Sequence, residues 1–188
     1  MNKNRLEAFS DGVIAIIITI MVLELRPPES AAVADLATVF PGWLRYLLSY
    51  VYVGIYWINH HALLNKFSRV DGGALWANMH LLFWMSLIPY VTAWAGENPM
   101  EPVPVALYGF ILLMCSISFM LLSWRLHAAE AVSKQAAGYR NKNRLSIGLY
   151  ALAILVSLSH PPTGSLIHVL LALIWIYPDR REQAGSFL

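Results

Sequence analysis

The hydrophobic residues of this chain form long runs separated by short polar breaks. A helix needs about 20 apolar residues to cross a bilayer core about 30 Å thick. Six runs have about this length, at 4–25, 40–64, 73–95, 103–126, 142–159 and 163–178. Proline, glycine or charged residues mark the breaks, as in RPP at 26–28 and HPPTG at 160–164. The pattern predicts an all-α, polytopic membrane protein with six transmembrane helices, and residues 1–188 form a single unit.

Composition points to the same class of protein. Hydrophobic residues make up 58% of the chain, charged residues make up 13%, and the mean hydropathy is +0.55. A soluble domain of 188 residues could not bury this much apolar surface. The one cysteine, Cys115, lies in an apolar run, which excludes an intrachain disulfide and a thiolate metal cluster. We expect no cofactor, no metal and no nucleic-acid partner.

Basic residues orient the predicted helices. With the N-terminus inside, eleven of the thirteen lysines and arginines lie on the cytosolic side: Lys3, Arg5, Lys66, Arg69, Arg125, Lys134, Arg140, Lys142, Arg144, Arg180 and Arg181. Only Arg26 and Arg45 lie near the opposite side. This distribution follows the positive-inside rule and predicts that both termini are cytoplasmic. Acidic residues in the basic N-terminus favour a retained first span over a secretory signal.

The first predicted helix combines a charged entrance with an apolar run. Asp11 lies at its start, and from Gly12 to Leu25 every residue except Thr19 and Glu24 is apolar. A charge inside a bilayer costs about 3 kcal/mol on insertion scales, so Asp11 needs a partner or water. At 100° per residue, one narrow sector of this helix carries Arg5, Phe9, Gly12, Ile16, Thr19, Ile20 and Leu23. This stripe suits either a tight helix contact or the wall of a narrow pore, and periodicity does not separate the two.

Polar residues of the second and third predicted helices lie at the same depth as Ser10 and Asp11. They are Asn59, His60, His61, Asn78 and His80. We expect Ser10 and Asp11 to hydrogen-bond with some of them and so to hold three helices together. Histidine titrates near neutral pH, so a pH sensor or a proton relay is an alternative. A metal site is disfavoured because His60 and His61 point about 100° apart on one helix.

We expect supporting roles for the remaining histidines and for the tryptophans. His160 and His168 flank the last external turn without a carboxylate or thiol nearby, so we expect surface histidines. The tryptophans lie mostly near the ends of the predicted helices, as in the aromatic belts at membrane interfaces. The chain has no HEXXH, GXSXG, P-loop or dinucleotide-binding motif, so we do not expect an enzyme.

The segment RLEAFSDG at 5–12 opens the first helix with an Arg-x-x-x-Phe-Ser-Asp motif. The motif resembles that of the transmembrane protein 175 family of potassium-permeable channels, with its residues at Arg5, Phe9, Ser10 and Asp11. Chains with a single six-helix unit resemble the prokaryotic branch, which assembles as a homotetramer. The resemblance therefore implies passive conduction of potassium ions across a prokaryotic cell membrane.

The same resemblance assigns roles along the first helix. Four copies of this helix would line a central pore, with Ile16 as the hydrophobic constriction that gates it. Thr19 would form the hydroxyl layer for selectivity, and Ile20 and Leu23 would continue the narrow wall. A serine of the eukaryotic branch corresponds to Ala15, which implies a weaker preference for potassium over sodium.

Two other classes of function stay open at this point. One is a secondary transporter that uses Asp11 and the histidines as a proton or cation site. Inverted-repeat transporters have two halves of matched pattern, which this sequence does not show. The other alternative is a non-conducting scaffold or assembly protein.

Overall fold

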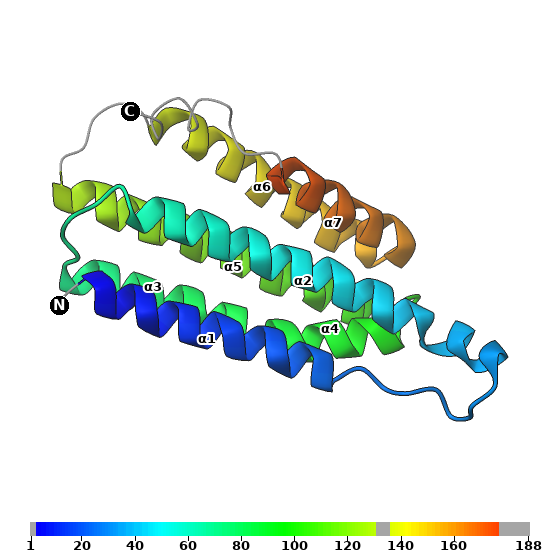
Figure 1. The fold of residues 1–188 in the computed structure, drawn as a ribbon. Coiled ribbons are helices and arrows are strands. Elements are labelled where there is room, and N and C mark those ends of the chain that lie inside the picture. The colour runs from blue at the N-terminus through cyan, green and yellow to red at the C-terminus, as the bar shows by residue number, and fades with distance from the viewer. Residues whose placement is uncertain (1–2, 131–135, 177–188) are drawn as a thin grey trace.

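The computed structural model describes residues 3–130 and 136–176 (Figure 1). Its helices are α1 (Lys3–Leu23), α2 (Leu36–Leu64), α3 (Gly72–Ser86), α4 (Ile88–Glu97), α5 (Pro102–Glu130), α6 (Ala136–Ser157) and α7 (Pro161–Ile176), with a short 3-10 helix, η1, at Val33–Asp35. The described residues contain no strand. The prediction of an all-α fold is confirmed. The expected end of the last helix at 178 lies outside the described residues, as do Lys134, Arg180 and Arg181.

The third predicted span, 73–95, is present as a candidate span over Gly72–Glu97, but a break at Leu87 divides it into two helices. α3 ends at Ser86 and α4 starts at Ile88. Pro89 has no N–H group to offer the carbonyl of Met85, so the α-helical ladder stops here. The N–H of Leu87 bonds instead to the carbonyl of Trp84, at 3.2 Å. α4 continues beyond the end of α3 in Figure 1, so the pair corresponds to one of the six predicted helices.

Three described helical segments are long and apolar enough to cross a membrane. They are Lys3–Leu23, Gly72–Glu97 and Pro102–Ala128. The apolar parts of α6 and α7, Asn143–Ser157 and Pro161–Ile176, are shorter. α2 is not among these three segments; its 29 residues include four tyrosines, two histidines and Arg45.

α1 lies at one edge of the bundle and the α6–α7 hairpin lies at the other (Figure 1). α1 packs against α2, α3 and α4, whereas α5 packs against α3, α4, α6 and α7. Fully buried residues of α5, such as Leu112, Cys115 and Leu122, lie in the hydrophobic core. The bundle therefore keeps one side of α1 free of intrachain cover.

His168 of α7 is fully buried, which corrects the prediction of a surface histidine, whereas His160 is exposed. The ring of His168 lies edge to face with that of Tyr108, with centroids 5.4 Å apart. Gly109 makes room for it, because a Cβ atom there would lie 2.7 Å from Nε2 of His168. Neither ring nitrogen has a hydrogen-bond partner among the described residues. The glycine on α5 therefore fixes how closely α7 can approach.

Candidate functional site

The two faces of α1 differ in burial. Leu6, Ile14, Ile17 and Met21 each keep at most 2% of their surface exposed, because they face the core. The predicted pore residues lie on the other face, where the exposed fractions are 58% for Ile16, 41% for Ile20 and 80% for Leu23. Phe9, Gly12 and Thr19 are exposed on the same side. The stripe seen in the sequence is thus the face of α1 that its own chain leaves uncovered.

Thr19 has a defined hydroxyl orientation within this stripe. Its Oγ1 donates a hydrogen bond to the carbonyl of Ile16, at 2.8 Å. The proton of the hydroxyl is therefore engaged inside the helix, and the oxygen lone pairs are left as acceptors on the exposed side. Such an oxygen is suited to a cation and offers nothing to an anion.

Ser10, Asn78 and His60 form a hydrogen-bond chain that joins α1, α3 and α2. Ser10 Oγ donates to the carbonyl of Leu6 at 2.9 Å and accepts from Nδ2 of Asn78 at 3.0 Å. The Oδ1 of Asn78 lies 2.7 Å from Nε2 of His60. Because Oδ1 can only accept, Nε2 of His60 carries the proton. All three side chains are at least 98% buried, so the chain of bonds is closed off from bulk water.

Asp11 takes no part in this chain of hydrogen bonds, although we expected it to pair with the asparagines or histidines of α2 and α3. Its Oδ1 accepts a hydrogen bond from the indole Nε1 of Trp57 on α2, at 2.9 Å. Consecutive residues point about 100° apart on a helix, so Ser10 faces the core while Asp11 lies on the exposed side. The predicted contact between α1 and α2 is present, but a tryptophan makes it.

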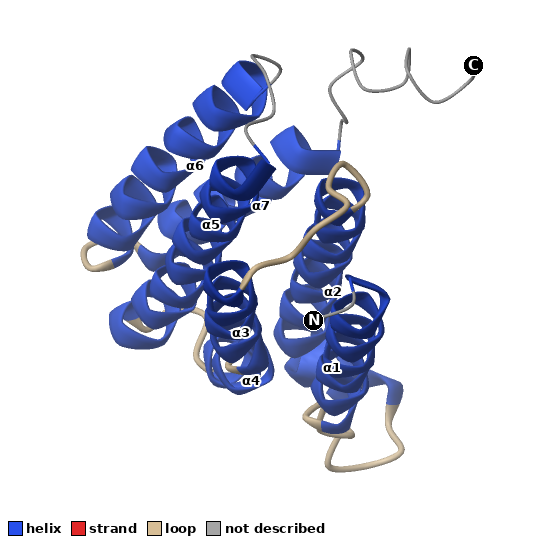
Figure 2. Ribbon diagram, turned by 90° about the vertical axis from the view of Figure 1, so that its left-hand side faces the viewer, coloured by secondary structure: helices blue, strands red, loops and turns tan. Residues whose placement is uncertain are grey.

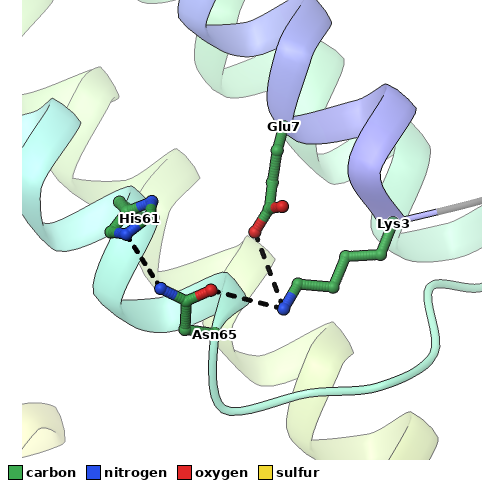
Figure 3. Close-up of polar contacts among 4 residues, drawn as sticks. All are labelled: Lys3, Glu7, His61 and Asn65. Carbon is green, nitrogen blue, oxygen red and sulfur yellow. Dashed lines mark hydrogen bonds and ion pairs between the residues drawn. The ribbon is translucent and has the colours of Figure 1, made fainter.

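A second set of polar contacts holds the start of α1 to the end of α2 (Figure 3). Lys3 Nζ lies 3.6 Å from Oε1 of Glu7 and donates to Oδ1 of Asn65 at 3.4 Å. Nδ2 of Asn65 in turn lies 2.9 Å from Nε2 of His61. His61 is exposed, so it lies at the surface end of this set and outside the buried chain around His60.

The other predicted polar residues have partners elsewhere. Nδ1 of His80 lies 2.9 Å from Oγ of Ser118 on α5, and its Nε2 accepts from Nε1 of Trp84 at 3.1 Å. Asn59 donates to the carbonyl of Ile55 on its own helix, at 2.7 Å. Arg5 is exposed at the start of the α1 stripe. The structure therefore brings together only part of the predicted cluster.

Sequence reasoning missed Trp57, which it treated as an interfacial anchor. A usable signal was present, because Trp57 is three residues before His60 and so lies within one turn of the polar end of α2. An indole N–H is a neutral donor that can bond to a carboxylate at a membrane interface. In the described part of the chain, no group of three or more His, Cys, Asp or Glu side chains could hold a metal ion.

Comparison with known proteins identifies the family. Residues 5–89 match the family model described as the endosomal/lysosomal potassium channel TMEM175. A protein named as a potassium channel from Chryseobacterium sp. (strain P1-3) is 46% identical over 184 residues, which cover 96% of each chain. The chain belongs to the TMEM175 family. A second relative, named as a potassium channel from Streptomyces collinus, is 29% identical over 99% of this chain and 100% of its own length.

A solved structure of the TMEM175 family has the same fold. It is the crystal structure of a lysosomal potassium-selective channel TMEM175 homolog from Chamaesiphon minutus, which superimposes with a TM-score of 0.85 at 28% identity. The match covers 93% of this chain and 96% of that one. Together with its apolar helices, this membership makes the chain an integral, multi-pass membrane protein of an ion-channel family.

Proposed function

We propose that this protein is a passive, potassium-permeable cation channel in a prokaryotic cell membrane, with both termini in the cytoplasm. The observation that carries the proposal is the uncovered face of α1, on which Ile16 is 58% exposed and Leu23 is 80% exposed. The same helix begins with the family motif and contains Thr19 among its apolar residues. A face of this kind needs either lipid or further copies of the chain to cover it.

A homotetramer gives this face a function. Four α1 helices around one axis would place four Ile16 side chains in a ring. A ring of large aliphatic side chains excludes water when it is narrow, so it can close the pore by dewetting and open it by a small tilt or rotation of α1. Ile20 and Leu23 would extend the apolar wall toward the C-terminal end of α1.

Thr19 would supply the polar layer of this pore. Its hydroxyl proton is bonded to Ile16, so four copies would direct oxygen lone pairs toward the axis. These oxygens can replace part of the hydration shell of a cation. A potassium ion holds its hydration shell less strongly than sodium, which gives the layer a preference for potassium.

The polar network at the N-terminal end of α1 would support the pore helix. Ser10, Asn78 and His60 connect α1 to its neighbours through buried bonds, and Asp11 adds the bond to Trp57. A pore helix held at one end can move at the other end without leaving the bundle. Potassium is the permeant ion in this proposal, and no step requires a cofactor.

Currents from the purified protein in a planar bilayer test the proposal. With opposed potassium and sodium gradients, we expect unitary currents that reverse between zero and the potassium equilibrium potential and do not shift with a pH gradient. A reversal potential that follows the pH gradient would favour a coupled transporter that uses Asp11 and the histidines. Liposomes that contain folded protein but show no potassium flux would favour a scaffold.

A further inference from the structure

Two further helix faces of the chain expose large side chains, many of them aromatic. The α2 face consists of Trp43, Leu47, Tyr50 and Trp57, which are 46% to 57% exposed. The α3–α4 face consists of Trp76, Met79, Phe83 and Tyr90, which are 44% to 79% exposed. Neither face is covered by another helix of the described chain.

The helices that carry these two faces are all neighbours of α1. In Figure 2, α2 lies above α1 and the α3–α4 pair lies to the left of α1. The packing of α1 against α2, α3 and α4 agrees with this view. α1 is therefore at a corner of the subunit, next to both of the helical segments that carry the aromatic faces.

We propose that the α2 face of one subunit packs against the α3–α4 face of the next subunit. This interface rests on the proposed function, because it assumes a rotation axis along the uncovered stripe of α1. Rotation about such an axis brings two different flanks of neighbouring copies together, which makes the interface heterologous and closes a ring.

Side-chain chemistry separates these two faces from the exposed face of α7. The large exposed side chains of α7 are all aliphatic: Leu166, Val169, Leu170, Leu173, Ile174 and Ile176. Aromatic residues and methionine are enriched at protein interfaces. Membrane-interface belts do not account for Tyr50, because it lies at the middle of α2 rather than at an end. The aromatic faces are thus suited to protein contact and α7 to lipid.

One hydrogen bond between α4 and α2 indicates which residues of the two faces lie at the same height along the helix axes. α2 runs antiparallel to the α3–α4 pair, and Thr92 on α4 donates to Ser49 on α2 at 2.7 Å. Tyr50 follows Ser49 and Tyr90 precedes Thr92 by two residues, so the tyrosines are level to within about 1.5 Å, one residue of helix rise. An axis along the membrane normal preserves height, so Tyr50 of one subunit should meet Tyr90 of the next.

Each of the two exposed tyrosines has a half-buried aromatic ring beside it on the same helix. The rings of Tyr46 and Tyr50 lie 6.3 Å apart between centroids, and those of Tyr90 and Trp94 lie 6.1 Å apart. Helix association in a membrane depends on van der Waals packing and interhelical hydrogen bonds. Large flat rings with hydroxyl groups provide both.

Cysteine cross-linking tests the interface in the full-length protein. The variant carries Tyr50→Cys and Tyr90→Cys, and Cys115 is fully buried and stays out of the reaction. A disulfide needs Cα atoms within about 7 Å of each other. Under mild oxidation in membranes, we expect a ladder of bands up to the tetramer. The matched control carries Tyr50→Cys and Trp76→Cys. Trp76 is more exposed than Tyr90 but lies about 21 Å from it along the α3–α4 pair, at 1.5 Å per residue. We expect no ladder from this control.

A mixed experiment tests the heterologous geometry. Chains with Tyr50→Cys and one tag are co-expressed with chains that carry Tyr90→Cys and a second tag, and we expect dimers that contain both tags and nothing larger. Dimers with a single tag, or a ladder in the control pair equal to that in the test pair, would overturn the interface. If the doubly substituted chain fails to fold, a photo-cross-linking phenylalanine analogue at position 50 should attach to residues near Tyr90 of another chain, and attachment only to lipid would overturn it.

Native mass spectrometry and bilayer currents distinguish this interface from the proposed function. A conducting tetramer without the Tyr50–Tyr90 cross-link would reject the interface and leave the channel in place. A folded protein with neither a tetramer nor a current would reject both.

Discussion

Replacement of Asn78 gives the most quantitative prediction, because this residue makes the buried hydrogen bonds to both Ser10 and His60. Replacing Asn78 with leucine keeps the size of the side chain and removes the bonds of 3.0 Å to Ser10 and 2.7 Å to His60. Ser10 keeps its bond to the carbonyl of Leu6, whereas Nε2–H of His60 loses its partner. An unsatisfied buried donor costs about 1–3 kcal/mol, so we expect Asn78→Leu to lower the free energy of unfolding by this amount.

A double-mutant cycle isolates the bond between Ser10 and Asn78. We expect Ser10→Ala and Asn78→Leu to couple by about 0.6 kcal/mol, and by at most about 1.7 kcal/mol, as for other hydrogen bonds inside membranes. Reversible unfolding by SDS in mixed micelles, followed by tryptophan fluorescence, gives the four free energies. All samples need the same protein concentration, because oligomers gain stability by mass action.

The matched control for this cycle is Ser86→Ala on the same helix. The hydroxyl of Ser86 is exposed and donates only to the carbonyl of Phe83, so the change in free energy should stay within about 0.5 kcal/mol. If Asn78→Leu lowers the free energy of unfolding by no more than this control does, the buried hydrogen bonds do not hold α1 in place. Strictly additive losses in the cycle would show that Ser10 and Asn78 act independently.

The other predictions concern the pore helix and the α5–α7 contact. Ile16→Asn should raise unitary conductance by wetting the constriction, and an unchanged current from folded tetramer would assign the gate to another residue. Thr19→Ala should lower the permeability ratio of potassium to sodium measured from reversal potentials, and an unchanged ratio would remove Thr19 from selectivity. Gly109→Ala should lower the free energy of unfolding by about 1–3 kcal/mol, because the added methyl group overpacks against His168. Adding His168→Ala should restore part of that loss, and failure to do so would mean that another contact is responsible.

The sequence predicted the helices and the uncovered face of α1 because both depend on local pattern. Runs of about 20 apolar residues give the helices directly. Ile16, Thr19 and Leu23 fall on one side of α1 by helix geometry alone, and they are exposed together in the structure. Their roles in conduction stay a prediction.

Features that depend on contacts between helices could not be read from the sequence. Ser10 and Asp11 are neighbours in the chain, yet one is buried against Asn78 and the other bonds to Trp57. The burial of His168 depends on a glycine on a different helix. Such outcomes follow from the relative rotation of packed helices, which periodicity leaves undetermined.

The interruption at Leu87 divides the support of α1 between two separate helices. α3 holds the N-terminal half of α1 through Asn78, whereas α4 packs near its C-terminal end, where Met21 and Thr92 border a common cavity of about 370 Å³. A straight helix over 73–95 would transmit any displacement of one half to the other. With the break after Ser86, α4 can shift with the C-terminal end of α1 while α3 keeps its bond to the motif end, so separate helices support the two ends.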